Sequence, residues 1–222
     1  MEKCNSISDK SNKTLIIKIQ YCSELHMEFH ENMRFMKSLP LEPVGDVLVI
    51  AGDVGYLVDT TIPHLRFWKW ASENYRQVLM IAGNHEYYNN GDIAAQGESW
   101  QKMYMPNVGS FRKISTMNSS ETSRSSKRLW LIAMPKKIVV VTHHLPTFAA
   151  IEDRHKGSVL NAAYATELGN YIADSRISAW IYGHSHHTTD LTIGNTRLVS
   201  NPLGYIFCGE HTNFNDSAVI EV

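Results

Sequence analysis

Residues 78–86 have the sequence VLMIAGNHE, in which an apolar run ends abruptly in a glycine and three polar side chains. A short apolar run bounded by glycine is typical of a buried strand. Asn84, His85 and Glu86 are not packing material, so the stretch predicts a strand that carries chemistry at its tip. Four other segments share this pattern: IKIQYCSELH at 17–26, DVLVIAGD at 46–53, KIVVVTHH at 137–144 and AWIYGHSH at 179–186.

Predicted strands and helices alternate along the chain. Between the strand at 46–50 and the one at 78, residues 60–77 predict a helix with a threonine cap and Pro63 in its first turn. The order strand, helix, strand makes the sheet at least partly parallel. Other strands are expected at 14–22, 137–142, 179–182 and 218–222, with a hairpin turn at 194–195.

The remaining segments predict shorter or less regular elements. An amphipathic helix is expected to end before Pro40, and further helices are expected at 91–105 and 160–174. The polar, serine-rich stretch 115–128 predicts a mobile loop rather than a substrate lid. The segment RLWLIAMP at 128–135 fits either a short strand or a helical turn, and both alternatives stay open.

Length and composition restrict the class of protein. The 222 residues suffice for one sizeable α/β domain, expected at 14–222 after a polar, disordered leader at 1–13. A formal net charge of -1 gives no global field that would draw the protein onto duplex nucleic acid or an anionic membrane. The three cysteines form no CxxC pair, and no apolar run is long enough to cross a bilayer. We therefore expect a reducing, cytoplasmic location.

Metal-ligand side chains follow all five of the predicted strands. None of them is a thiol: Glu24, His26, Asp53, Asn84, His85, His143, His144, His184 and His186. The carboxyl ends of parallel strands meet at one edge of a sheet, so residues distant in sequence can converge there. The set is too large for one catalytic zinc ion, which typically takes three protein ligands. Two cations about 3.5–4 Å apart that share a carboxylate would use these donors.

Five motifs, taken in this order and spacing, resemble those of the calcineurin-like metallophosphoesterases over residues 16–205. They are S-E-L-H at 23–26, G-D at 52–53, G-N-H-E at 83–86, T-H-H at 142–144 and G-H-S-H at 183–186. The segment VSNPLGY at 199–205 is similar to the closing segment of small bacterial-type members. The resemblance implies a four-layer α/β/β/α sandwich and a dinuclear metal centre. It also implies hydrolysis of a phosphomonoester or phosphodiester by a bridging hydroxide.

The resemblance also assigns roles residue by residue. It implies that Glu24, His26 and His186 hold a first metal, that Asn84, His143 and His184 hold a second, and that Asp53 bridges the two. His85 would face the phosphate and protonate the leaving oxygen. His144 is expected to support the site or face the substrate rather than bind metal, and Glu86 to support His85 or a loop. Mn²⁺ is the expected metal, with iron or zinc as alternatives.

Two features depart from the family pattern. Glu24 stands where the family has aspartate, so its longer side chain predicts weaker affinity or an altered preference at the first metal. The region 105–135 is short and serine-rich, so the sequence does not predict the shape of the substrate pocket. A small phosphate ester is the expected substrate. The alternatives are a nuclease, which lacks a visible basic stripe, and a binding scaffold that has lost turnover. The oligomeric state is left open.

Overall fold

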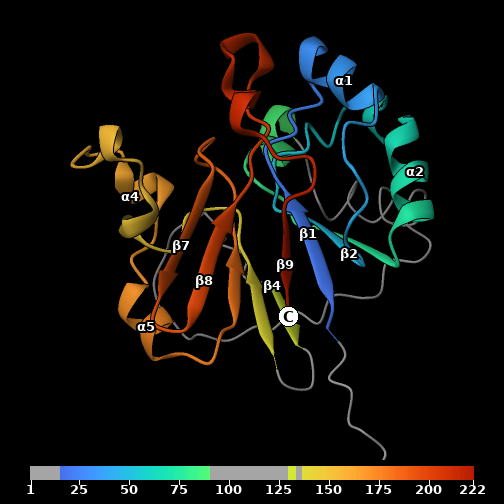
Figure 1. Cartoon of the computed structure of the whole chain (residues 1–222). Coiled ribbons are helices and arrows are strands. Elements are labelled where there is room, and N and C mark those ends of the chain that lie inside the picture. Colours follow the sequence, from blue (N-terminus) through green and yellow to red (C-terminus); the bar gives the residue numbers. More distant parts are fainter. Residues whose placement is uncertain (1–15, 91–129, 134–136) are drawn as a thin grey trace, which may run out of the picture.

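Two β-sheets lie face to face in the computed structural model, which describes residues 16–90, 130–133 and 137–222 (Figure 1). The first sheet has the order β3-β2-β1-β9. Its strands are β1 (Lys18–Cys22), β2 (Val47–Ile50), β3 (Gln77–Met80) and β9 (Val219–Glu221). β1, β2 and β3 run parallel, as the strand–helix–strand order predicts, and β9 runs antiparallel to β1.

The second sheet has the order β4-β5-β6-β8-β7. Its strands are β4 (Trp130–Ala133), β5 (Ile138–Val141), β6 (Ala179–Ile181), β7 (Thr189–Ile193) and β8 (Thr196–Ser200). β5, β6 and β8 are parallel, whereas β4 and β7 are antiparallel to their neighbours. The predicted hairpin at 194–195 joins β7 to β8. For residues 128–135 the sequence fits either a strand or a helical turn, and the structure has a strand there, β4.

The strands that precede the predicted tips end level with one another. In the first sheet Cys22 pairs with Ile50 and Ile50 with Met80; in the second, Val141 pairs with Ile181. The polar residues that follow these strands therefore emerge at the same edge of each sheet.

The fold has four layers, and three buried apolar clusters lie between them. Ile19, Val49, Val141 and Ile181 belong to the buried cluster between the two sheets. A second cluster joins the first sheet to α1 (His30–Lys37) and α2 (Arg66–Asn74), and a third joins the second sheet to α5 (Gly169–Asp174) and the segments beside α4 (Asn161–Tyr164). Figure 1 shows α1 and α2 on one side of the sheets and α4 and α5 on the other. The predicted α/β/β/α sandwich is confirmed.

The predicted helix at 160–174 is wrong as one element. It is two short helices, because the chain between them forms tertiary contacts: Ala165 bridges to Leu145, and Leu168 donates its backbone N–H to the carbonyl of Pro146. The carboxylate of Glu167 accepts the backbone N–H groups of Phe148 and Gly169. These bonds outweigh the helical periodicity of the sequence.

The predicted start of the helix at 60–77 is also corrected. Pro63 lies in a separate 3₁₀ turn, η1 (Ile62–His64), and α2 begins only at Arg66 with Leu65 as its N-cap. No threonine side chain caps either element. Among the described residues the other short 3₁₀ helices are η2 (His85–Asn90), η4 (Phe148–Ala150), η5 (Asp153–His155), η6 (Ile206–Cys208) and η7 (Glu210–Asn213).

Three sequence-based predictions fall outside the described residues: the leader at 1–13, the helix at 91–105 and the loop at 115–128. Among the helices that the structure describes, none combines the length and apolar character needed to span a membrane.

Candidate metal centre

The backbone is strained beyond the ends of three of these strands, β1, β2 and β6. Five of the predicted metal ligands, none of them glycine, have positive φ angles: Glu24 (55°), His26 (44°), Asp53 (53°), His184 (70°) and His186 (47°). Each such conformation costs about 1–3 kcal/mol in a residue with a Cβ, and it persists only where the surrounding structure fixes it. The fold therefore fixes the backbone at these five residues and with it the direction in which each side chain leaves the chain.

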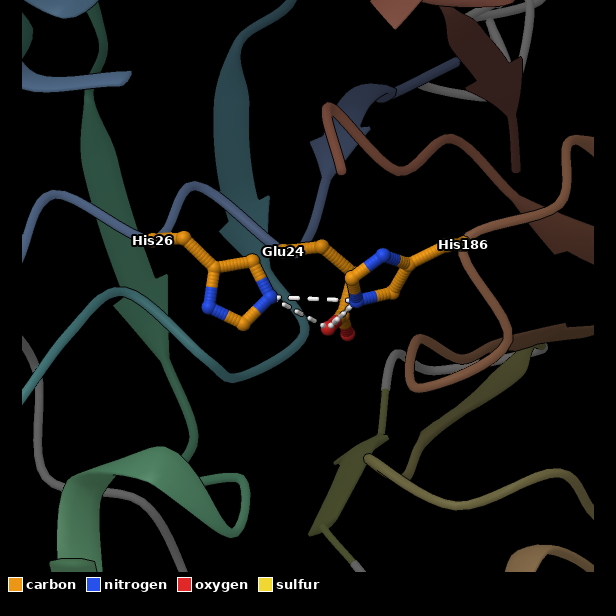
Figure 2. Close-up of side chains that lie close together, drawn as sticks. All are labelled: Glu24, His26 and His186. Carbon is orange, nitrogen blue, oxygen red and sulfur yellow. Dashed lines mark hydrogen bonds and ion pairs between the residues drawn. The ribbon is translucent and has the colours of Figure 1, made fainter. Parts of the chain in front are cut away.

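Glu24, His26 and His186 form the first cluster, drawn in Figure 2. His26 Nε2 lies 3.2 Å from Glu24 Oε2 and 3.1 Å from His186 Nε2, and His186 Nε2 lies 3.0 Å from Glu24 Oε2. Glu24 and His26 are completely buried. Three donor atoms thus face a single point, although His186 comes from the other sheet.

Two further carboxylates orient the imidazoles of the first cluster. His26 Nδ1 lies 3.2 Å from Glu28 Oε1, and His186 Nδ1 lies 2.6 Å from Glu210 Oε2. A carboxylate accepts the Nδ1–H in each pair, so a neutral ring turns its Nε2 lone pair toward Glu24. Burial lowers the pKa of His26, but its hydrogen bonds to Glu24 and Glu28 outweigh burial and raise the pKa to about 10. A cation at the meeting point of the lone pairs would replace that proton.

Asn84, His143 and His184 form the second cluster. His143 Nε2 lies 3.0 Å from Asn84 Oδ1 and 3.2 Å from His184 Nδ1. His143 Nδ1 donates to the carbonyl of Ala51 (3.0 Å), which leaves Nε2 with its lone pair in the neutral ring. The amide of Asn84 donates to the hydroxyl of Tyr88 (3.0 Å), so its oxygen is turned toward His143.

Asp53 lies between the two clusters. Its carboxylate lies near His143 and His184 on one side and near His26 and His85 on the other. In each of these two sets the ligand atoms lie within 4.8 Å of one another. Asp53 Oδ2 lies 3.4 Å from His143 Nε2, while Oδ1 accepts the backbone N–H of His85 (2.9 Å). The position fits a carboxylate shared by two cations.

Glu24 reaches the first cluster despite the extra methylene. Its Oε2 is the oxygen that faces the two imidazoles, and its Oε1 accepts the backbone N–H of His184. Gly183 makes room for the longer side chain, because a Cβ there would lie 2.6 Å from Glu24 Oε1. The predicted weakening of the first site is not tested by this geometry and stays a prediction.

Glu86 ties two tips of the first sheet together. It is fully buried and accepts the backbone N–H groups of Asp53 (3.1 Å), Val54 (2.7 Å) and Gly83 (2.6 Å). Burial and the charge of Asp53 raise the pKa of Glu86 to about 7. Glu86 thus supports the loop that carries Asp53, one of the two roles considered for it.

His85 is buried beside both clusters. Its Nδ1 lies 2.6 Å from Glu28 Oε1, and its Nε2 lies 3.5 Å from the hydroxyl of Tyr205. His144 is half-buried, and its ring lies 4.4 Å from that of His184, which fits a supporting position.

All eight predicted site residues lie together, but sequence reasoning missed two carboxylates that orient them. Glu28 follows His26 by two residues and is buried in contact with both His26 and His85. Its position just after a strand tip is the signal that could have identified it. Glu210 lies in the polar tail and reaches His186 across 24 residues, so no local pattern marks it.

The chain is similar in sequence to known proteins. The model of a family described as calcineurin-like phosphoesterase matches residues 17–188. Protein L509 of Acanthamoeba polyphaga mimivirus is 23% identical over 274 aligned positions, which cover 92% of this chain and 96% of the relative.

Two solved structures resemble the chain along most of its length. The phosphopantetheinyl hydrolase of Mycobacterium tuberculosis has a TM-score of 0.57 at 14% identity and covers 92% of this chain and 95% of its own. An archaeal phosphodiesterase has a TM-score of 0.47 at 14% identity and covers 93% and 99%. The first of these likenesses supports the fold.

Proposed function

Because the chain belongs to the calcineurin-like phosphoesterase family and is a hydrolase of phosphoric esters, we propose that its reaction depends on two divalent metal ions held by the two clusters. The proposed ligands of the first ion are Glu24, His26 and His186; those of the second are Asn84, His143 and His184; Asp53 is shared by both.

The proposal is carried by lone pairs that face one another. In each cluster, hydrogen bonds at Nδ1 of His26, His186 and His143 turn the Nε2 lone pairs toward oxygen or nitrogen atoms 3.0–3.2 Å away. Acceptors that face each other at this distance in a buried site repel unless a proton or a cation lies between them. Right-angled ligands of a metal, each about 2.1 Å from it, are separated by about 3.0 Å.

When bound, two divalent ions would polarise the phosphate oxygens and lower the pKa of bound water toward neutrality. His85 acts on the leaving group. The Glu28 carboxylate accepts its Nδ1–H and stabilises the positive charge that the ring bears when both nitrogens are protonated. His85 Nε2 can then donate its proton to the departing oxygen.

Mn²⁺ is the metal we propose, with iron or zinc as alternatives, because mixed imidazole, carboxylate and amide ligands suit these ions better than magnesium or calcium. The substrate is a small phosphate ester. The cytoplasmic location expected from the cysteines and the single domain expected at 14–222 stay predictions.

Metal analysis combined with turnover tests this function. The purified chain should bind two equivalents of Mn²⁺ and hydrolyse aryl phosphate esters, and EDTA should remove both properties. Asp53→Ala should lower the affinity of both sites, because it deletes the shared carboxylate. The matched control is Asp153→Ala, since the side chain of Asp153 is 91% exposed on η5. A chain that stays inert with two metals bound would contradict the proposed catalysis.

The two alternative functions have less support. A scaffold without turnover would have no need for five ligands in left-handed conformations that the fold must stabilise. A nuclease would need a basic track for a polyanion. None of the ion pairs formed by the described lysines and arginines reaches a residue of the two clusters.

A further inference from the structure

The charge around the clusters limits which phosphate ester they can accept. Two divalent ions would bring four positive charges. Five carboxylates contact the proposed ligands or belong to them: Glu24 and Asp53 within the clusters, Glu28 at 3.2 Å from His26 Nδ1, Glu210 at 2.6 Å from His186 Nδ1, and Glu86, which accepts the backbone N–H of Asp53 (3.1 Å). These carboxylates offset the metal charge completely, so little positive charge remains for a substrate.

In the described part of the chain, lysine and arginine side chains add no positive charge to the two clusters. The ion pairs of the described basic residues are formed with acids outside the clusters: Lys18 with Glu221, Lys69 with Glu73, Arg154 with Glu152, Lys156 with Asp153, and Arg197 with Asp190. No described lysine or arginine has a recorded hydrogen bond or ion pair with a cluster residue. Among the described residues nothing would therefore compensate the two negative charges of a phosphomonoester, whereas a phosphodiester adds only one.

Neutral aromatic rings occupy the positions around the clusters instead. The ring of Tyr205 lies 4.6 Å from those of His26 and His186, and the ring of Tyr164 lies 4.7 Å from that of His184. The ring of Tyr88 lies 4.7 Å from that of His85. These three tyrosines, here called the tyrosine rim, come from three separate segments of the chain.

The tyrosine rim is accessible to a ligand. Tyr88 and Tyr164 are 48% and 44% exposed, although each contacts a buried or half-buried histidine of the centre. Phe207 extends the rim, since its ring stacks on Tyr205 with an interplanar angle of 18° and is 57% exposed. Flat aromatic faces bind flat substituents by stacking, and phenol hydroxyls donate hydrogen bonds without adding charge.

From these two observations we propose that the substrate is a small, singly charged phosphodiester in which one alcohol carries an aromatic ring. The inference rests on the proposed function and specifies its substrate class. In the reaction, water adds to phosphorus and the P–O bond to one alcohol breaks. The departing oxygen takes a proton from His85, one proton of the water restores His85 and the other is released to solvent, which gives an alcohol and a doubly charged phosphomonoester. The doubly charged product fits the charge-balanced site less well than the substrate, which favours its release.

Binding of non-hydrolysable analogues tests the proposal without turnover. Diphenylphosphinate has one charge and two rings, phenylphosphonate has two charges and one ring, and dimethylphosphinate has one charge and no ring. Calorimetry on the Mn²⁺-loaded protein, at a pH where phenylphosphonate is doubly charged, should rank diphenylphosphinate first. Its advantage over each of the other two should be about tenfold or more, the usual effect of one stacked ring. Phenylphosphonate binding as tightly as diphenylphosphinate would overturn the charge argument, and dimethylphosphinate binding as tightly would overturn the rim.

Variants of the rim separate charge from stacking. Tyr164→Leu should weaken diphenylphosphinate and leave dimethylphosphinate unchanged, whereas Tyr164→Lys should strengthen phenylphosphonate. Tyr171→Leu is the matched control, because Tyr171 lies on α5, is 51% exposed and has no recorded ring contact with a site histidine. If Tyr164→Leu and Tyr171→Leu behave alike, the rim does not bind the substituent and the proposal is wrong.

Hydrolysis distinguishes failure of this inference from failure of the proposed function. Bis(4-nitrophenyl) phosphate should be preferred over 4-nitrophenyl phosphate and over a single-stranded oligonucleotide in kcat/KM. Faster turnover of the monoester or the oligonucleotide would refute the substrate class and keep the metal-dependent hydrolysis. Absence of turnover on all three with metal bound would refute the proposed function itself.

Discussion

Shortening Glu24 to aspartate should selectively weaken the first metal site. The substitution removes one methylene and withdraws both carboxylate oxygens by about 1.5 Å. Glu24 Oε2 lies 3.0 Å from His186 Nε2 and Oε1 accepts the backbone N–H of His184, so both contacts would be lost together. The backbone cannot follow easily, because Glu24 has φ of 55° and its N–H donates to the carbonyl of Gly52 (3.1 Å).

The expected size of the effect follows from these lost contacts. Metal–ligand distances tolerate deviations of about 0.2 Å, so a displacement of about 1.5 Å deletes the ligand. A hydrogen bond to a charged group contributes about 1.5–3 kcal/mol, which corresponds to a loss of about 10- to 150-fold in affinity. The side chains of Asn84, His143 and His184 are unchanged, and His184 loses only the hydrogen bond to its backbone N–H, so the second site should stay within a few-fold of its original affinity.

Calorimetric titration with Mn²⁺ measures both sites in one experiment. The unmodified chain should bind two equivalents, and the Glu24→Asp variant should bind one equivalent at the original strength and the other much more weakly. Glu221→Asp removes the same methylene at an exposed edge of β9 and is the matched control. An unchanged or increased affinity at the first site would refute the reasoning, and an increase would favour the sequence-based expectation that the longer side chain weakens this site.

Three further predictions address the groups around the ligands. Burial lowers the pKa of His143, but Asp53 and Glu24 raise it to about 9, and the pKa of His26 is about 10. Each metal must displace one such proton, so competition with a chelator should show affinities that rise about tenfold per pH unit below pH 9; a flat profile would contradict this. Glu210→Gln should lower the affinity of the first site about 10- to 100-fold and spare the second, as measured by metal content after dialysis. Glu28 also orients His26, so its variant is tested at saturating Mn²⁺. Glu28→Gln should then slow alkyl esters about tenfold or more and 4-nitrophenyl esters far less, because a good leaving group needs no proton from His85. Equal slowing of both would exclude the role in proton donation.

The strand tips were predictable because their signal is local. An apolar run followed by glycine and a polar ligand, as at Gly83 and Asn84, identifies both the strand and the chemistry at its end. The two orienting carboxylates were not predictable in the same way. Glu28 lies just after a strand tip, but the neighbouring apolar residues have helical spacing, which favours a solvent-facing position for an acidic side chain. Glu210 reaches His186 only through the folded chain.

Local periodicity also failed where tertiary contacts decide the backbone. Residues 160–174 have helical spacing, yet Glu167 binds the backbone at Phe148 and interrupts the helix. Thr61, two residues before Pro63, is of a residue type that often caps helices. The chain forms a 3₁₀ turn there instead, and the helix begins later, at Arg66. The bond between Glu167 and Phe148 joins residues 19 positions apart, which a sequence window does not contain, whereas the hydroxyl of Thr61 is taken by a local partner, Asp59 (2.6 Å).

Each cluster draws its ligands from both sheets. Glu24 and His26 follow β1, whereas His186 follows β6; Asn84 follows β3, whereas His184 again follows β6. A growing polypeptide therefore cannot assemble the second set of proposed ligands before the ribosome has added residue 184, or the first before residue 186. Loading with metal would then come late in synthesis, and a chain truncated before residue 184 would lack part of both sites however well its first sheet formed.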